Sequence, residues 1–437
     1  MTASANIHEG QTVVMKFGGT SVADAGRIKR AAGRIVQAAE DGNRVVAVLS
    51  ARGKTTDELV AMAEEVSEHP HPREMDMLLS TGERISCALA AMVINDLGHE
   101  AISLTGSQAG IVTDTSHTKA RILDVRADRI STALDDEKIV LVAGFQGVST
   151  SSDVTTLGRG GSDTTAVALA AALGADVCEI YTDVAGVFSA DPRIVPDAKK
   201  LAVVSFEEML EMAASGAGVL QLRAVEYARN HGIPLHCRSS FDDRPGTFVV
   251  DEHTTMERPL VTAVTHSTDE ARITLTGLPD RPGIAGRVLT ALADANVNVD
   301  MIIQNEPESE GQRADMSFTV PRSDLPDARS ALEPLKSELG IGDVASDDRM
   351  GKVSIVGAGM KSHPGVAART FSVLGEAGVN IEMISTSPIK ISCVIREEEV
   401  EDAVRGLHAA FDLGSDAIRR EDVQGDHRPV IRPDEAA

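Results

Sequence analysis

The chain has 437 residues, 42% of them hydrophobic and 25% charged, and this length predicts about two or three domains rather than a single core. The formal net charge of −24 argues against nucleic acid and anionic membranes as partners, because both bind basic surfaces. The four cysteines include no Cys-x-x-Cys pair, which argues against a zinc site and is typical of a reducing compartment.

The beginning of the chain gives no sign of export. Residues 1–6 contain neither a basic segment nor an apolar one, as a secretory signal would require. No apolar run approaches the ~20 residues needed to cross a bilayer. The sequence therefore predicts a cytoplasmic protein.

Strands alternate with helices along the first 250 residues. The first expected strand, Thr12–Phe17, runs into a glycine pair and a helix over about 24–39. The apolar stretch Arg44–Ser50 is typical of a strand buried in a parallel sheet. Further strands are expected at 101–104, 139–142, 177–181 and 233–237, and helices at about 56–66 and 74–97. This alternation predicts an α/β domain over residues 1–250, with a mainly parallel sheet and helices on both faces.

A polar stretch that begins at Gly246 predicts a linker, set at residues 251–266, and the chain beyond it repeats itself. Pro282 and Pro364 are 82 positions apart, and so are Asn298 and Asn380. Each copy shows strand and helix signals in the order βαββαβ, which is the ferredoxin-like pattern. The copies are assigned to residues 267–345 and 346–414, and the charged residues 415–437 are expected to be disordered.

The stretch from Thr155 to Ala166, TTLGRGGSDTTA, has several features of an anion-binding site. Its glycines allow a close approach of the backbone, and Arg159 is a forked donor for a carboxylate or phosphate. Ser162 or Asp163 can cap the helix that follows. A helix N-terminus behind a glycine-rich turn can bind an anion. The alternative is a tight turn with Arg159 in solvent.

Three other stretches contain candidate ligands, and no metal-binding set of His and Cys residues is evident. Lys16 ends the first strand just before Gly18 and Gly19, at the sheet edge where α/β proteins bind ligands, although a plain turn explains this pattern equally well. Glu83 could receive an ammonium group or be a solvated helix charge. The segment Asp191-Pro192-Arg193 suits a turn with a cation that faces phosphate.

Together these motifs resemble the aspartate kinases of the amino-acid-kinase fold. The motifs are KFGGTSV, LLSTGERIS, GFQGV, TTLGRGGSDTTA and YTDVAGVFSADPR, in this order, and the C-terminal repeat is similar to the paired ACT domains of that family. The resemblance runs from about Val13 to Leu413. It implies an amino-acid-kinase catalytic domain followed by two ACT domains. It also implies transfer of the ATP γ-phosphoryl group to the β-carboxylate of L-aspartate, the first step of lysine, threonine and methionine biosynthesis.

The resemblance implies roles for particular residues. The expected catalytic residues are Lys16 and Asp163. The residues expected to bind the substrate are Ser50, Glu83, Arg159, Gly160, Gly161 and Ser162. The residues expected to bind ATP are Lys16, Phe17, Gly18, Gly19, Thr55, Thr182, Asp183, Phe188, Asp191, Pro192 and Arg193. Mg²⁺ is expected to bridge the phosphates with few protein ligands, so no metal-binding residue is assigned.

Two positions depart from the family pattern. Gly218 stands where relatives commonly carry a lysine that contacts ATP, and Arg223 or Arg193 could supply the charge instead. Arg52 stands where relatives usually have methionine, and Lys54 follows it closely. Extra positive charge is therefore expected at the phosphate end of the site.

Within the family, the resemblance is to the actinobacterial form that lysine and threonine inhibit together. It implies effector pockets at the start of the first helix of each ACT domain and along its second strand. The expected effector-binding residues are Asp280, Arg281, Pro282, Gly283, Ile284, Ala285, Asn298, Asp300, Gln304, Val366, Ala367, Asn380, Ile381 and Ser387. A homo-oligomer is expected, or an α2β2 assembly with an ACT-only subunit from an internal start near Met256.

Three alternatives remain open. The acceptor could be glutamate, because Glu83 and Arg159 fit any α-amino acid. The chain could be a catalytically inactive amino-acid sensor, which the presence of Lys16, Arg159 and Asp163 argues against. The ACT pockets could also be empty, because folds shed functions freely.

Overall fold

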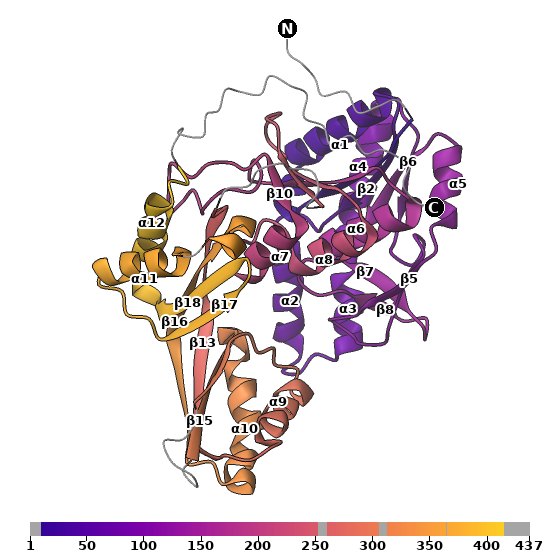
Figure 1. Ribbon diagram of the computed structural model, residues 1–437. Coiled ribbons are helices and arrows are strands. Elements are labelled where there is room, and N and C mark those ends of the chain that lie inside the picture. The colour runs from indigo at the N-terminus through magenta and orange to yellow at the C-terminus, as the bar shows by residue number, and fades with distance from the viewer. Residues whose placement is uncertain (1–9, 252–259, 306–312, 364, 415–437) are drawn as a thin grey trace, which may run out of the picture. The chain divides into compact units, whose positions relative to one another are not determined.

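The computed structural model describes residues 10–251, 260–305, 313–363 and 365–414. Residues 1–9, Met256 and the tail 415–437 therefore lie outside the described residues. The chain forms two compact units, one made of Met1–Val187, Lys200–Ala213 and Gly218–Met256, the other of Phe188–Lys199, Ala214–Ala217 and Glu257–Ala437. Figure 1 labels many of the elements named below.

The first unit contains an α/β domain whose strands and helices alternate along the chain. Its elements are β1 (Thr12–Phe17), η1 (Gly19–Val22), α1 (Ala25–Glu40), β2 (Arg44–Leu49), α2 (Thr55–Val66), α3 (Pro72–Leu79), α4 (Thr81–Asp96), β3 (Ala101–Leu104), β4 (Ile111–Thr113), β5 (Ile122–Val125), α5 (Asp128–Asp135), β6 (Ile139–Ala143), β7 (Gln146–Ser149), β8 (Val154–Thr156), α6 (Gly161–Leu173), β9 (Val177–Thr182), β10 (Val203–Ser205), α7 (Phe206–Ala214), α8 (Leu222–His231), β11 (Leu235–Ser239) and β12 (Thr247–Val250).

An eight-stranded sheet in the order β10-β12-β11-β9-β1-β2-β6-β3 forms the centre of this unit. Its pairs are parallel except β11–β12, so the predicted mainly parallel sheet is confirmed. Alternate residues of β1, namely Val13, Met15 and Phe17, pack in one core with α1 and α4. Because side chains alternate along a strand, Lys16 lies on the opposite face, with α6.

A smaller sheet in the order β5-β4-β7-β8 was not predicted. Its strands have three or four residues each, which is too short for a clear alternating pattern. The predicted linker, set at residues 251–266, is partly wrong at its far end. Thr247–Val250 forms strand β12, which pairs with β11 and β10, and residues 263–266 already belong to strand β13.

The helix predicted over 74–97 is two helices, α3 and α4, that meet at Ser80. Ser80 is fully buried, and its carbonyl accepts a hydrogen bond from the Gln146 side chain at 2.8 Å. By length and composition alone, Pro72–Asp96 could cross a membrane, unlike the expectation from the sequence, but half of its most apolar window is buried. Cys87, Ala90 and Ile94 of α4 pack in the core with α1, and a buried core helix passes the same test.

The second unit contains the repeated half of the chain. Its elements are β13 (Ala263–Pro279), α9 (Ile284–Asp294), β14 (Ile302–Gln304), β15 (Arg313–Val320), η3 (Arg322–Asp324), α10 (Leu325–Leu339), β16 (Asp343–Val356), η4 (Ala358–Ser362), α11 (Val366–Glu376), β17 (Met383–Ser387), β18 (Lys390–Arg396), η5 (Glu397–Glu399) and α12 (Val400–Ala410).

The two repeats share one antiparallel sheet within a single chain, in the order β14-β15-β13-β16-β18-β17. The far half of β13 pairs with β15 on one side and with Asp343–Asp347 of β16 on the other, whereas its first half, Ala263–Ser267, pairs with Lys352–Val356 of β16. The second repeat therefore takes its fourth strand from residues that precede the first repeat. The predicted βαββαβ order is thus completed in the second repeat by β13 and not by a strand after α12.

The hydrophobic cores of the two repeats are also divided between the two halves of β13. Val261 and Val264 pack with α11 and α12, whereas Ile273 and Leu275 pack with α9 and α10. In Figure 1, α9 and α10 lie together beside β13 and β15. The domain boundary predicted at 345/346 falls inside the continuous strand β16.

Candidate active site

Lys16 and Asp163 form a buried ion pair at the carboxyl end of β1. The Lys16 Nζ lies 2.5 Å from Asp163 Oδ1, and the two side chains are 12% and 8% exposed. A Cβ placed on Gly18 would lie 3.5 Å from the same Nζ. A cation, a carboxylate and a glycine backbone therefore meet where a parallel sheet binds its ligands.

Asp163 belongs to the first turn of α6, a helix that is buried around almost its whole circumference. The helix begins after Gly160, whose φ of 72° is in the left-handed region that favours glycine. Ser162 packs so close to Gly144 that a Cβ on Gly144 would lie 2.7 Å from the Ser162 Oγ. Arg159 is exposed and forms no ion pair with another described residue, so its guanidinium is available to an anion.

Glu83 is buried, which excludes the solvated helix charge as its interpretation. The side chain is 3% exposed, and its Oε1 accepts a hydrogen bond from the Ala51 backbone N–H at 3.2 Å. The Oε2 atom is buried and has no partner among the described residues. Burial raises the pKa of Glu83 to about 7, because removal of water disfavours the charged form.

The other residues expected at the site fall in both units. Ser50 follows β2, Thr55 begins α2, and Thr182 ends β9 with Asp183 directly after it. Phe188, Asp191, Pro192 and Arg193 belong to the second unit. There the Arg193 Nη2 lies 2.6 Å from Asp191 Oδ2, so this guanidinium pairs with the carboxylate of its own turn.

Some residues near the site were not singled out by the motifs. A Cβ on Gly82 would lie 2.8 Å from the Ala51 Cβ, and a Cβ on Gly19 would lie 2.9 Å from the Ala51 carbonyl oxygen. Ala51 therefore lies against both the loop that contains Gly19 and the helix that carries Glu83. Its only sequence signal is its place directly after an apolar strand, and that signal does not specify a role.

The positions that depart from the family pattern have these surroundings. Arg223 donates hydrogen bonds to the Leu157 and Ala120 carbonyls at 3.2 and 3.1 Å. Arg52 donates to the Ala23 carbonyl at 3.3 Å, and Lys54 precedes the first residue of α2. A Cβ on Gly218 would meet no atom within 4 Å.

The expected effector residues lie around the start of α9 and α11 and the ends of the edge strands. Gly283 and Gly365 precede these helices with φ values of 93° and 103°, so both repeats use the same glycine turn. Asp300 Oδ2 lies 2.6 Å from Lys352 Nζ, and Asn380 donates to Glu382 at 3.3 Å. Asn298 and Gln304 are exposed.

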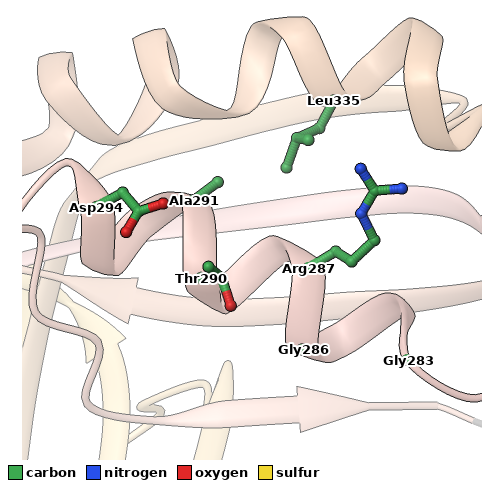
Figure 2. Close-up of a pocket in the computed structure, with 7 residues that line it drawn as sticks. All are labelled: Gly283, Gly286, Arg287, Thr290, Ala291, Asp294 and Leu335. Carbon is green, nitrogen blue, oxygen red and sulfur yellow. The ribbon is translucent and has the colours of Figure 1, made fainter.

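A groove of 390 Å³ lies between α9 and α10 of the first repeat. Figure 2 shows Arg287 of α9 and Leu335 of α10 projecting into the space between the two helices. Of the expected effector residues, Gly283 alone lines this groove. The groove and the predicted effector pocket are therefore different places on the same repeat.

Comparisons with known proteins agree with this arrangement. Residues 11–239 match the amino acid kinase family, and residues 272–337 and 353–411 each match an ACT domain. The aspartokinase of Mycobacterium tuberculosis is 58% identical over 407 residues, which are 92% of this chain and 97% of that protein.

Solved structures give the same result. Aspartokinase III of E. coli in complex with aspartate and ADP (R-state) is 28% identical, with a TM-score of 0.79 over 92% of this chain and 99% of that one. The same enzyme in complex with lysine and aspartate (T-state) gives a TM-score of 0.69, at 28% identity over 91% of this chain and 99% of that one.

The fold and the site define a kinase of the amino acid kinase family that carries a pair of ACT domains. The sequence identity places it more narrowly. The chain belongs to the aspartokinase family, and it is a phosphotransferase with aspartate kinase activity.

Proposed function

We propose that the chain transfers the γ-phosphoryl group of ATP to the β-carboxylate of L-aspartate, in the cytoplasm, under feedback control by lysine and threonine. Glu83 would bind the α-ammonium group of aspartate and Arg159 its α-carboxylate. Lys16 and the backbone amides of Gly18 and Gly19 would hold the phosphates. The bound aspartate and ADP of the E. coli relative support this choice of ligands.

The observation that carries the substrate assignment is the unpartnered Oε2 of Glu83. A buried carboxylate oxygen that lacks a hydrogen bond lowers the unfolding free energy of a protein by about 1–3 kcal/mol, and by more when the group is charged. An ammonium group placed there would satisfy that oxygen and favour the ionised form of Glu83. This contact would strengthen the binding of an α-amino acid.

The chemistry needs no general base, because the attacking β-carboxylate is already ionised at neutral pH. Catalysis would then rest on alignment and on neutralisation of the phosphoryl oxygens during transfer. Lys16 would supply positive charge at the phosphoryl group, and Asp163 would hold the Lys16 ammonium through their 2.5 Å ion pair. The N-terminus of α6 would add the partial positive charge of its free N–H groups.

Mg²⁺ fits this site as an ion held mainly by the phosphates. No group of three or more metal-binding side chains occurs in the part of the chain that the structure describes, and Mg²⁺ commonly binds through one or two carboxylates plus phosphates. Asp163 would supply the protein oxygen. The ion would neutralise phosphate charge, while Lys16 orients the phosphoryl group.

The regulatory part of the proposal rests on the ACT pair. The lysine complex of the E. coli relative supports lysine as an effector, and joint action with threonine follows from the resemblance to the actinobacterial form. A coupling free energy of about 1–3 kcal/mol between the effector and active sites is enough for feedback. An α2β2 assembly with an ACT-only subunit stays a second possibility, and the solution mass of the purified full chain would test it.

The test is the ATP-dependent formation of an acyl phosphate, trapped with hydroxylamine, on aspartate and on glutamate in parallel. We expect turnover on aspartate that falls most strongly when lysine and threonine are both present. The Lys16→Ala variant should lose about 100-fold or more in kcat, because a cation that acts in the transition state is removed. Lys29→Ala, which removes an exposed lysine on α1, is the matched control and should keep full activity.

Each part of the proposal can fail separately in this assay. Full activity of Lys16→Ala would exclude its phosphate role, and preferred turnover of glutamate would exclude the acceptor. Turnover on aspartate that ignores both effectors would remove the feedback part. No turnover, combined with tight binding of lysine or threonine, would indicate an amino-acid sensor.

A further inference from the structure

Asp76 is a buried carboxylate in α3 that belongs to none of the motifs assigned above. Its side chain is fully buried, and burial of a charge is unfavourable unless hydrogen bonds compensate for it. Asp76 accepts hydrogen bonds from the Thr118 backbone N–H at 3.0 and 3.2 Å and from the Thr156 hydroxyl at 2.5 Å. His117 Nδ1 lies 2.6 Å from Oδ2, which is a hydrogen-bond distance.

The partners of Asp76 lie on both sides of the loop that carries Arg159. Thr156 is the last residue of β8, and Leu157 and Gly158 follow it directly. On the other side, the Thr118 carbonyl oxygen would lie 3.3 Å from a Cβ on Gly158. The Ala120 N–H donates to the Thr156 carbonyl at 2.9 Å, so the two segments also contact each other directly.

Thr118 has an unusual backbone conformation, with φ at 66°. A β-branched residue is strained in this left-handed region, and such strain persists where neighbouring groups impose it. Both carboxylate oxygens of Asp76 accept from the Thr118 N–H. Asp76 therefore holds Thr118 in the conformation that brings its carbonyl against Gly158.

The helix of Asp76 also leads to Glu83. The Ser80 N–H donates to the Asp76 backbone carbonyl at 3.0 Å, and α4 begins one residue later with Glu83 in its first turn. The Gln146 side chain fixes the junction through its 2.8 Å bond to the Ser80 carbonyl. Asp76 thus connects the helix pair that carries Glu83 with the loop that carries Arg159.

We propose that Asp76 is a positioning residue for amino-acid recognition, which sets the Arg159 loop relative to Glu83. This inference rests on the proposed function, in which Glu83 and Arg159 bind the ammonium and carboxylate groups of one α-amino acid. A carboxylate and a guanidinium that the protein holds at a fixed separation select an α-amino acid, which carries an ammonium and a carboxylate group, over ligands that carry a carboxylate alone. A loss of Asp76 would therefore weaken aspartate binding more than ATP binding.

The test is Asp76→Asn in the full-length chain, which keeps the shape of the side chain but removes one acceptor. We expect KM for aspartate to rise about tenfold, since a hydrogen bond to a charged group contributes roughly 1.5–3 kcal/mol. KM for ATP should change by no more than about twofold. Thr156→Val removes a single hydrogen bond to Asp76 and should give a smaller rise, which keeps the test valid if Asp76→Asn folds poorly.

The matched control acts at the other end of the contact between α3 and β8. Arg73 lies on the same helix, and its Nε is 2.8 Å from Asp153 Oδ1, just before β8. Arg73→Gln breaks this half-exposed pair away from the Arg159 loop. It should leave KM for aspartate unchanged.

A double-mutant cycle with Arg159→Gln separates positioning from general stability. If Asp76 acts through Arg159, Asp76→Asn should produce no further rise in KM for aspartate in the Arg159→Gln background. A rise of the same factor in both backgrounds, or an unchanged KM in Asp76→Asn, would overturn the inference and leave the proposed function intact. A normal KM in Arg159→Gln alone would instead remove the carboxylate role of Arg159, and the inference with it.

Discussion

At the residue scale, the motifs identify candidate site residues, but the burial of each side chain decides what its chemistry is. The motif LLSTGERIS identifies Glu83 as a candidate but is compatible with a solvated helix charge. The fold decides between the two, because it covers Glu83 to 3% exposure and raises its pKa to about 7. The sequence alone would assign Glu83 the ordinary glutamate pKa of 4.5.

The pKa of Glu83 predicts how aspartate binding depends on pH. Below about pH 7 the ligand-free carboxyl is increasingly protonated, so KM for aspartate should rise as the pH falls. Glu83→Gln should raise KM roughly ten- to a hundredfold, through loss of a charge-assisted hydrogen bond of about 1.5–3 kcal/mol, and should abolish this pH dependence. Steady-state kinetics between about pH 6 and 8 would measure both effects.

The pH dependence of unfolding in the ligand-free protein provides a control. Aspartate binding should improve as the pH rises, whereas the stability of the ligand-free protein should fall. The folded pKa of Glu83 is raised, so the stability that its protonated form contributes is present below the unfolded pKa and is lost as the pH rises through about 7. Wild type should therefore lose stability relative to Glu83→Gln between about pH 5 and 8. An identical pH profile of KM in both proteins would rule out the ammonium-binding role.

At the scale of single elements, helix α6 has a glycine in the left-handed conformation at each end, and the two differ in their surroundings. Gly160 has φ 72° and Gly174 has φ 58°. A Cβ on Gly160 would overlap the side chain of Gln221, whereas a Cβ on Gly174 would meet nothing within 4 Å. The sequence predicted a turn before this helix, but the close contact with Gln221 required the structure.

This difference gives a matched pair of substitutions. Gly160→Ala and Gly174→Ala should each lose about 1–2 kcal/mol of unfolding free energy, because alanine disfavours the left-handed region. Gly160→Ala should also lower kcat/KM for aspartate by about tenfold or more, since the clash displaces the start of α6 next to Arg159 and Asp163. Gly174→Ala should keep its activity. Equal activity of both variants in the hydroxylamine assay would show that the geometry of this turn is unimportant.

At the scale of the whole molecule, ion pairs in equivalent places join the two repeats of the second unit. Asp300 of the first repeat pairs with Lys352 at the start of the second, at 2.6 Å, and Glu382 of the second pairs with Arg272 of the first, also at 2.6 Å. Asp300 and Glu382 are 82 positions apart, the spacing of the repeat. Lys352 is also 2.7 Å from Glu270, and both of these side chains are almost fully buried.

Removal of the buried cation should therefore affect both repeats. Lys352→Met leaves Glu270 buried without its partner, which typically costs about 3–5 kcal/mol. Burial raises the pKa of Glu270, so the carboxyl group loses its proton as the pH rises and its charged form is then costly to bury. The loss of stability in Lys352→Met should therefore be larger at about pH 8 than at pH 5. Denaturant unfolding of the full chain at the two pH values would measure this.

Two further variants test the mechanism of that defect. Arg272→Met breaks a more exposed pair and should cost less, and Lys352→Met combined with Glu270→Met should recover much of the loss, since apolar side chains can replace a buried ion pair. A Lys352→Met variant with wild-type stability at both pH values would show that the buried pair contributes nothing to the shared sheet.

Local patterns in the sequence were enough to predict most of the longer strands and helices, the mainly parallel sheet, the repeat and the motifs at the strand ends. These features depend on local periodicity and on the conformations that glycine permits, and both can be read within a few residues. The three-dimensional structure was needed to show the burial of Glu83, the contacts of Asp76 with Thr118 and Thr156, and the exchange of strand halves between β13 and β16. Each of these depends on contacts between residues that are distant in sequence, such as the 80 positions between Asp76 and Thr156, and no local pattern contains that information.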